Sequence, residues 1–278
     1  MEVIKSGQNP KIKELLALQE KSKLRRERGL FVVEGRRELE HCIAAGYTVR
    51  SLFVCPDVYG DFSTSLEMTK EDSLSFRPSE ASGEIPGNAV FYVSREVYDK
   101  IAYRGGTEGI IAEVVTPERT LKDLNLPENP LVMVLEAVEK PGNLGAVLRS
   151  ADAAKADAVI ICDPLTDLFN PNLIRASIGA VFTVPVVTAT SEETISFLKD
   201  KRIQILTAQL QDSSLYYDCD MKRGTALVMG TESSGLSDKW RQAADAHIRI
   251  PMLGRLDSLN VSVSAAILLF EAVRQRNK

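Results

Sequence analysis

The sequence predicts an α/β protein whose C-terminal half forms a parallel sheet, and two observations indicate this fold. From residue 131 onward, short apolar segments of strand length alternate with segments of helix length, as in parallel sheets covered by helices on both faces. Three loops rich in Gly, Asn, Ser, Glu or Arg, at 136–149, 230–236 and the start of 250–273, each follow an apolar segment. Ligands of such sheets bind at the carboxyl ends of the strands, so we expect these loops to share one edge.

The first 115 residues predict a smaller α/β domain of their own. Asn9 and Pro10 favour a helix start, Gly29 and Gly46 favour helix ends, and Ser94 is a residue type that caps a helix. We expect helices over 8–28, 37–45 and just after 94, and strands over 30–33, 49–55, 89–93 and 110–115. Segment 57–88 is rich in Ser, Glu and Gly, which predicts a surface region with one short helix.

A linker is expected over 116–130, where three prolines stand among charged residues. Residues 131–278 form the second predicted domain, with strands over 131–135, 158–162, 184–187, 203–207, 226–229 and 248–250, and helices over 143–154, 171–178 and 191–200. Ser258 and Asn260 are types that begin a helix by accepting hydrogen bonds from its free N–H groups. The run that follows is apolar up to Phe270, so we expect this last helix to be buried on most of its surface.

Composition excludes several classes of protein. No apolar run reaches the length of a membrane span, and charges precede any apolar core at the N-terminus, unlike a signal peptide. The four cysteines form no CxxC pair, which favours free thiols in the cytoplasm over disulfides or a zinc site. With only two distant histidines, a histidine-based metal site or catalytic triad is not expected.

Charge is unevenly distributed along the chain. The net charge of −4 argues against non-specific binding to polyanions, but residues 21–28 are strongly basic. A basic patch on an acidic protein suits selective nucleic-acid binding, although such a run is also typical of a solvated helix face. The three loops contain neither GxGxxG nor GxxxxGK[ST], so their ligand is expected to carry few phosphates, as a nucleoside does.

The three loops resemble the sequence motifs of a known protein family. PGNLGAVLRSADA, VMGTESSGL and IPMLGRLDSLNVSVSAA resemble motifs 1, 2 and 3 of the SpoU/TrmH family, S-adenosylmethionine-dependent RNA 2′-O-methyltransferases of the SPOUT superfamily. RASIGAVFTVPV resembles the segment between motifs 1 and 2, and together these cover nearly all of residues 131–275. Residues 6–115 more loosely resemble the attached substrate-binding domain, which is similar to certain ribosomal proteins.

The resemblance implies more than the sequence pattern does. It implies a deep trefoil knot, a homodimer formed through the C-terminal domain, S-adenosylmethionine as cofactor, and methylation of a ribose 2′-hydroxyl in structured RNA. The N-terminal domain favours ribosomal RNA as the substrate. A transfer-RNA enzyme is the alternative, and an inactive RNA-binding protein of the same fold is a further one. No DNA, membrane or metal partner is expected.

The resemblance also assigns roles to single residues. The implied catalytic set is Asn143, Arg149, Glu232, Ser258 and Asn260, and the implied cofactor contacts are Thr207, Gly230, Ile250, Met252 and Leu259. RNA contacts are expected from Lys23, Arg25, Arg28 and Arg104. Arg149 could clamp the target phosphate and stabilise the developing alkoxide, or act as a base, and Glu232 could pair with Arg149 or hold the knot loops. The sequence differs from the usual family motifs at Ser264 and Lys140, but all of the residues named above are present.

Overall fold

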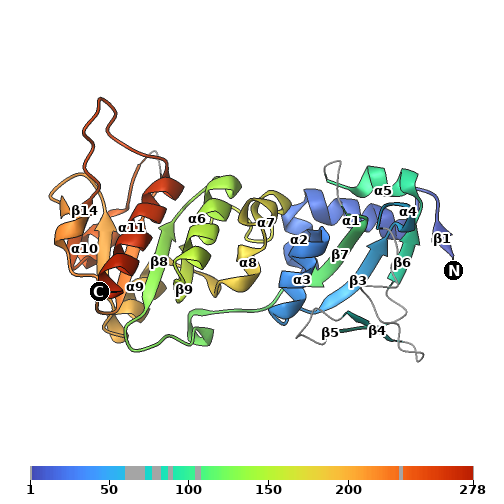
Figure 1. The fold of residues 1–278 in the computed structure, drawn as a ribbon, viewed down its shortest axis with the longest axis horizontal. Helices are drawn as coiled ribbons and strands as arrows, with labels where there is room; N and C mark the ends of the chain where they lie inside the picture. Colours follow the sequence, from blue (N-terminus) through green and yellow to red (C-terminus); the bar gives the residue numbers. More distant parts are fainter. Residues whose placement is uncertain are drawn as a thin grey trace. The chain divides into compact units, whose positions relative to one another are not determined.

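The computed structural model describes residues 2–59, 73–76, 83–86, 90–103, 108–231 and 234–277. Two of the predicted site residues, Arg104 and Glu232, lie outside these ranges. The chain divides into two compact units (Figure 1): unit 1 comprises Met1–Glu118 with Phe169–Arg175, and unit 2 comprises Arg119–Leu168 with Ala176–Lys278.

Unit 1 contains a five-stranded sheet in the order β1-β6-β3-β7-β2. β7 runs antiparallel to both of its neighbours, whereas the other pairs are parallel. The strands are β1 (Val3–Ile4), β2 (Leu30–Glu34), β3 (Val49–Val54), β6 (Val90–Val93) and β7 (Ile110–Val115); β4 (Ser73–Phe76) and β5 (Gly83–Pro86) form a separate antiparallel pair. The helices are α1 (Pro10–Glu20), α2 (Ser22–Arg28), α3 (Arg36–Ala44), α4 (Pro56–Tyr59) and α5 (Arg95–Ile101).

The apolar faces of α1 and α5 form the core of unit 1 with one face of the sheet. Ile12, Leu15 and Leu18 of α1 pack in one buried cluster with Val97 and Ile101 of α5. As predicted, Ser94 caps α5, and its side chain accepts a hydrogen bond from the backbone N–H of Val97.

The helix predicted over 8–28 is two helices, because the backbone is extended at Lys21. Arg25 caps the C-terminal end of the first helix, α1. Its Nη1 donates hydrogen bonds to the carbonyl oxygens of Leu18, at 2.6 Å, and Gln19, at 3.0 Å, near the end of α1, where a helix leaves carbonyls without partners. Arg25 is only 3% exposed, and its guanidinium is buried inside unit 1. The predicted contact of Arg25 with RNA is therefore wrong.

A segment distant in sequence completes unit 1. The ring of Phe169 stacks on that of Phe31, with centroids 4.2 Å apart, and Nδ2 of Asn172 donates to the hydroxyl of Tyr103 at 3.0 Å. The predicted domain 131–278 includes residues 169–175, because strand-and-helix patterning carries no information about which core an aromatic side chain joins.

Unit 2 contains a seven-stranded sheet in the order β10-β9-β8-β13-β11-β14-β12, and every neighbouring pair is parallel. The parallel α/β fold predicted for the C-terminal half is therefore confirmed. The strands are β8 (Leu131–Glu136), β9 (Ala158–Cys162), β10 (Val186–Ala189), β11 (Gln204–Ala208), β12 (Ser214–Leu215), β13 (Thr225–Met229) and β14 (Ala246–Arg249). The helices are α6 (Pro141–Ala153), α8 (Ala180–Thr183), α9 (Ser191–Asp200), α10 (Asp238–Ala243) and α11 (Val261–Arg276), and α7 (Pro171–Ser177) begins in unit 1 and ends in unit 2.

Helices lie on both faces of this sheet. Leu198 of α9 and Trp240 of α10 pack on a buried cluster of strand residues that includes Val132, Ile160 and Val228. α6 and α11 lie side by side (Figure 1) and pack against β8, β9 and β13. As predicted, most of the last helix is buried or partly buried, but Val263 is 47% exposed and Phe270 is 48% exposed, so two apolar side chains of α11 stay partly uncovered.

Other boundaries differ by a few residues. The strand predicted over 184–187 is β10, which starts two residues later, and β12 was not predicted because it contains two residues. α6 starts at Pro141 rather than 143, since proline suits the first helical position. The cysteines are free, and burial raises the pKa of the Cys162 thiol to about 12. In the described part of the chain, every helix is too short or too polar to cross a membrane.

Candidate active site

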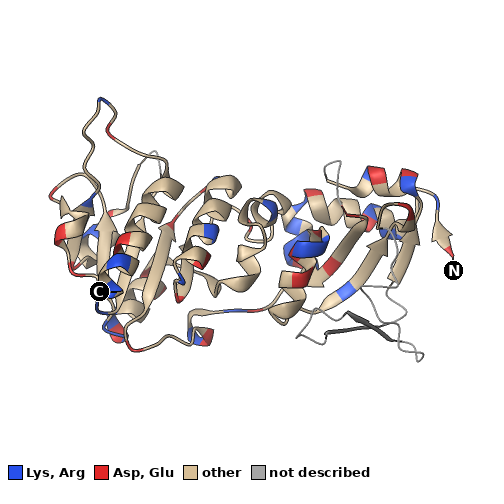
Figure 2. Cartoon of the chain, viewed as in Figure 1, with Lys and Arg blue, Asp and Glu red and all other residues tan. Residues whose placement is uncertain are grey.

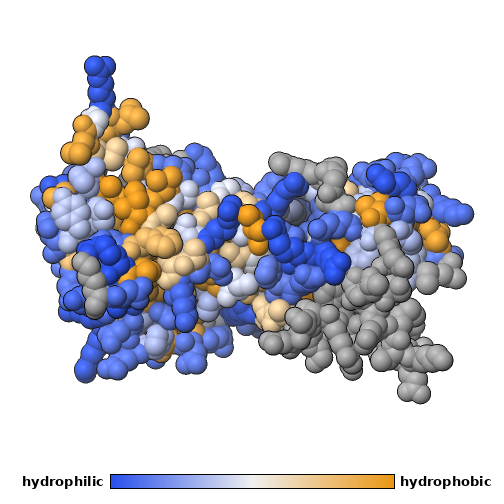
Figure 3. Space-filling view, viewed as in Figure 1, coloured by the Kyte–Doolittle hydropathy of each residue, from blue (hydrophilic) through white to orange (hydrophobic). Residues whose placement is uncertain are grey.

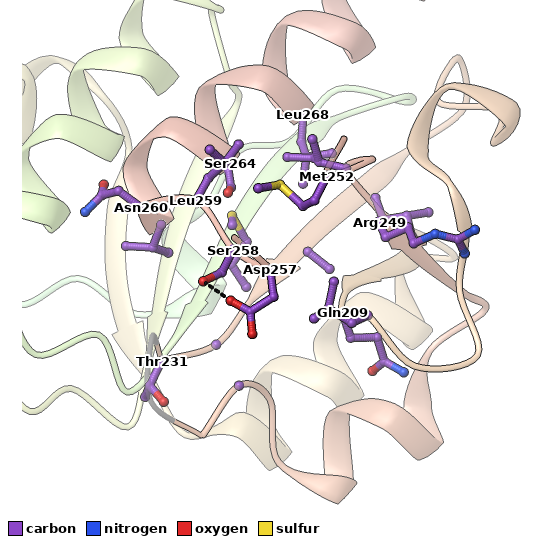
Figure 4. A pocket seen from close by; sticks show the side chains of 18 residues that line it. Gln209, Thr231, Arg249, Met252, Asp257, Ser258, Leu259, Asn260, Ser264 and Leu268 are labelled. Carbon is purple, nitrogen blue, oxygen red and sulfur yellow. Dashed lines mark hydrogen bonds between the residues drawn. The ribbon is translucent and has the colours of Figure 1, made fainter. Parts of the chain in front are cut away.

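The three predicted loops lie close together at the carboxyl edge of the parallel sheet of unit 2: the loops after β13 and β14 line a cavity, and the loop after β8 lines a smaller hollow beside it. β13 lies next to β8, and β11 lies between β13 and β14. The segments that follow β11, β13 and β14 line one cavity of about 450 Å³ (Figure 4). Its wall is formed by residues 208–210, 229–231 with 235, and parts of 248–268.

Most of the residues expected to contact a cofactor line this cavity. Gly230, Ile250, Met252 and Leu259 do so, together with the motif 3 pair Ser258 and Asn260. Thr207 does not. It is fully buried, and its Oγ1 lies 2.6 Å from Nδ1 of His247 on the neighbouring strand. The predicted cofactor contact of the Thr207 side chain is therefore wrong. This side chain joins two strands, and the cavity begins one residue later, at Ala208.

Sequence reasoning missed Gln209, Asp257 and Arg249, which also line the cavity. Gln209 is notable for its amide. Its Nε2 donates to the carbonyl oxygen of Gln211 at 2.9 Å, whereas its Oε1 is buried and accepts no hydrogen bond from the described residues. A signal for Gln209 exists in the sequence, since it directly follows an apolar strand, but a single glutamine is too common to single out.

Gly230 is fixed by a very close approach of backbone. A Cβ atom on Gly230 would lie 2.2 Å from the carbonyl oxygen of Gly235, a distance that real Cβ atoms do not reach. Thr231 and Gly235 also exchange two backbone hydrogen bonds of 3.2 and 3.1 Å. The loop therefore folds back on itself at the cavity wall, and only glycine fits at 230.

Motifs 1 and 3 are joined by a hydrogen bond between two asparagines. Nδ2 of Asn260 donates to Oδ1 of Asn143 at 3.1 Å. Asn260 also caps α11, since its Oδ1 accepts from the backbone N–H of Ser262 at 3.0 Å. Asn143 lies inside the first turn of α6 rather than at its cap, which is Lys140. A smaller hollow of about 140 Å³ lies here, lined by Lys140 and Asn143, and it shares Gly230, Thr231 and Val261 with the cavity.

The remaining catalytic candidates differ in position. Arg149 is exposed on α6 and does not line the cavity; it forms no hydrogen bond or ion pair with any described residue. Ser258 is exposed, and its Oγ donates to Asp257 at 3.2 Å. Pairing of Arg149 with Glu232 stays a prediction, because Glu232 lies outside the described residues.

These features define a class of protein: a parallel α/β domain with a cavity at the carboxyl edge, lined by main chain, apolar groups and a few polar side chains. It suits a nucleoside-like ligand and lacks the phosphate-binding loops of dinucleotide and nucleotide-triphosphate enzymes. The chain belongs to the SpoU rRNA methylase family, whose model matches residues 130–270. Residues 9–112 match the MRM3-like substrate binding domain. The resemblance inferred from the three motifs is thus confirmed.

Individual relatives cover most of the chain. The 23S rRNA (guanosine(2553)-2′-O)-methyltransferase RlmP of Bacillus subtilis is 27% identical over 97% of this chain and 98% of its own length. The 23S rRNA (guanosine-2′-O-)-methyltransferase RlmB of Pectobacterium atrosepticum is 35% identical over 74% of this chain and 86% of its own. A solved structure of an AdoMet-bound rRNA methyltransferase from Sinorhizobium meliloti has a TM-score of 0.82 and 29% identity, covering 98% of this chain and 97% of that one.

Proposed function

We propose that this protein transfers a methyl group from S-adenosylmethionine to a ribose 2′-hydroxyl in ribosomal RNA. The observation that carries the proposal is the hydrogen bond from Asn260 to Asn143, which joins motif 3 to motif 1 beside the cavity. The names of the relatives, which are 23S rRNA guanosine-2′-O-methyltransferases, favour ribosomal over transfer RNA as the substrate.

The cavity fits the cofactor that this reaction requires. Its volume of about 450 Å³ lies within the range of about 300–1,000 Å³ that is usual for small-molecule sites. Gly230, Ile250, Met252 and Leu259 would hold an adenosine between main chain and apolar side chains. The buried Oε1 of Gln209 offers an acceptor to a hydroxyl or amino group. When bound, the cofactor supplies an electrophilic methyl group, so the hard chemistry is its own.

The protein then has to align the ribose and assist the loss of its proton. Asn143, held by Asn260, orders the start of α6, on which Arg149 also lies. A guanidinium is normally always protonated, so we assign Arg149 to clamping a phosphate and stabilising the developing alkoxide. Action of Arg149 as a base is the alternative, and the lysine variant described below separates the two.

The direct test is mass spectrometry of ribosomal RNA from a strain that lacks the gene. We expect one ribose methylation to be lost and then restored by the purified protein with S-adenosylmethionine. If ribosomal RNA from this strain is fully methylated and transfer RNA lacks a methyl group, the substrate is transfer RNA instead.

We expect Gln209→Leu to weaken binding of S-adenosylmethionine by about tenfold, the effect of losing one hydrogen bond at a buried acceptor. Leucine keeps the size of the side chain and removes its acceptor. Calorimetry on the folded variant measures the change, and Gln211→Leu, outside the cavity wall, is the matched control. Unchanged affinity in Gln209→Leu would remove this residue from the site.

The proposed RNA surface of unit 1 centres on α2, where Figure 2 shows clustered basic residues. Lys21, Lys23, Arg26 and Arg28 are exposed. The one ion pair that Lys23 forms with a described residue, to Glu27 at 3.7 Å, is solvent-exposed and therefore weak. These cations are free to neutralise phosphates.

We expect Lys23→Ala with Arg28→Ala to weaken RNA binding and to lower the salt dependence of the affinity by about one unit of log–log slope per residue. Arg25→Ala should behave differently. Its buried hydrogen bonds predict a loss of stability of about 1–3 kcal/mol, with RNA affinity of the folded protein unchanged. Filter binding at several salt concentrations and thermal unfolding separate the two effects, and equal affinities for the double variant and wild type would contradict the surface.

The homodimer through unit 2 is part of the same proposal. Val263 and Phe270 leave an apolar face on α11, and Leu253 and Leu256 are 96% and 76% exposed in the loop before it. Figure 3 shows apolar residues gathered over this region. Monomeric sedimentation at micromolar concentration would contradict the dimer.

We also infer the knot and the location of the protein. The segment after β14 returns to the same cavity as the loop after β13, as a chain threaded through that loop would. Stretching the chain between its termini should then give a contour length shorter than that of an unknotted chain, and a full contour length would exclude the knot. A ribosomal RNA substrate and free thiols together favour the cytoplasm.

A further inference from the structure

A buried carboxylate lies just outside the cavity and has no role in the function proposed above. Glu136 is the last residue of β8 and is 8% exposed. Its Oε2 accepts a hydrogen bond from the backbone N–H of Ser237 at 2.8 Å, and its Oε1 accepts one from Oγ of Ser237 at 2.6 Å. One carboxylate thus holds a single residue of a different loop by two bonds.

Ser237 stands at the end of the motif 2 loop. It is the N-cap of α10, a position where serine usually accepts a hydrogen bond from the helix backbone. Here the side chain makes no such bond and donates to Glu136 instead. The Ser237 side chain therefore connects the motif 2 loop to β8 and does not cap α10.

The loop is tightly fixed at both ends. At its start, Gly230 packs against Gly235, and at its end Leu236 is buried in the apolar cluster that includes Trp240. Three described residues of the loop, Gly230, Thr231 and Gly235, form part of the cavity wall. Ser237 directly follows Leu236, so its two hydrogen bonds to Glu136 attach the end of this loop to β8.

A second contact of Glu136 shows which of its bonds matter. Ser191 Oγ lies 3.3 Å from Oε1 of Glu136 but 2.6 Å from Oδ2 of Asp163. A hydroxyl has one hydrogen to donate, and the shorter distance assigns it to Asp163. The same Ser191 oxygen accepts from Nε1 of Trp240 at 3.0 Å. Ser191 thus serves the core around Trp240, and the main bonds of Glu136 are those to Ser237.

We propose that Glu136 is a positioning residue for cofactor binding, which sets the motif 2 loop through Ser237. The inference rests on the proposed function only in taking S-adenosylmethionine as the ligand. What matters in this role is the reach of the side chain, because both bonds to Ser237 need an acceptor at the distance of a glutamate.

The order of two variants tests the role. Glu136→Gln keeps the reach: its oxygen can accept from the Ser237 N–H, and its NH₂ can donate to the Ser237 hydroxyl, which can also accept. Glu136→Asp keeps the charge but is one methylene shorter. We expect Glu136→Gln to bind S-adenosylmethionine within about twofold of wild type and Glu136→Asp to bind it about tenfold more weakly, by calorimetry on folded protein.

Ser237→Ala provides a variant that leaves the carboxylate in place. It should weaken binding less than Glu136→Asp does, and it should add little to the effect of Glu136→Asp, since both remove the same contact. Ser191→Ala is the matched control. Ser191 is 1% exposed and also lies near Glu136, with its Oγ 3.3 Å from Oε1, and its loss should lower thermal stability without changing cofactor affinity.

Hydrogen exchange of residues 230–237 without cofactor gives a readout independent of binding, and exchange there should be faster in Glu136→Asp than in Glu136→Gln. Wild-type affinity in Glu136→Asp, or weaker binding in Glu136→Gln than in Glu136→Asp, would overturn the inference. If the wild-type protein itself fails to bind S-adenosylmethionine, the proposed function falls instead, and the exchange experiment alone decides whether Glu136 holds the loop.

Discussion

Arg149→Ala is expected to lower the rate of methyl transfer by about 100- to 1000-fold, the usual effect of losing one electrostatic stabiliser of a developing oxyanion. Cofactor affinity should stay at the wild-type value, because Arg149 does not line the cavity. Its side chain is exposed, so the fold should tolerate the change. Single-turnover methylation measures the rate and calorimetry the affinity. A rate near that of wild type would exclude both proposed roles of Arg149.

Arg149→Lys separates those roles. Lysine keeps the positive charge but lacks the planar fork that binds a phosphate through two bonds. If Arg149 is a clamp, lysine should recover part of the rate and show no new limb in the pH profile. If Arg149 is a base, lysine should regain activity as the pH rises, because an ammonium loses its proton more easily than a guanidinium. Single-turnover rates of both variants as a function of pH decide between the two.

Gly230→Ala is expected to weaken binding of S-adenosylmethionine by at least about 100-fold, a penalty of about 2.7 kcal/mol. The new Cβ would lie 2.2 Å from the Gly235 carbonyl oxygen, and the next two contacts, at 2.3 and 2.6 Å, are also backbone atoms. Because all three contacts are backbone atoms, no side-chain rotation can relieve the clash. The motif 2 loop therefore has to shift, and the cavity wall shifts with it. Methylation should be lost together with binding.

Gly142→Ala is the matched control for this variant. Gly142 lies in the first turn of α6, near the same sheet edge, but a Cβ there meets no atom within 4 Å. Because alanine favours a helix over glycine, this variant should bind the cofactor normally and be as stable as wild type or more so. Normal binding in Gly230→Ala would mean that the loop does not form the wall of the cofactor site.

The sequence determined those features that depend on local pattern. Alternating apolar and amphipathic segments predicted the parallel sheet, and the position of each Gly-rich loop after a strand predicted one site edge. Asn260 was expected at the start of the last helix and does cap it. The three motifs identified the family, because residue types at fixed spacing can be recognised without knowledge of the fold.

The direction of a side chain and the residues that it contacts depend on the tertiary structure. Arg25 belongs to a basic run but turns inward to the carbonyls of α1, and Thr207 lies one residue from the cavity but faces His247. Phe169 joins the aromatic cluster of unit 1 from far along the chain. Glu136 reads as the polar end of a strand, and only folding brings Ser237 to it. Hydrogen bonds and packing join residues that are distant in sequence, and their geometry is fixed by how the strands are ordered, which no local pattern encodes.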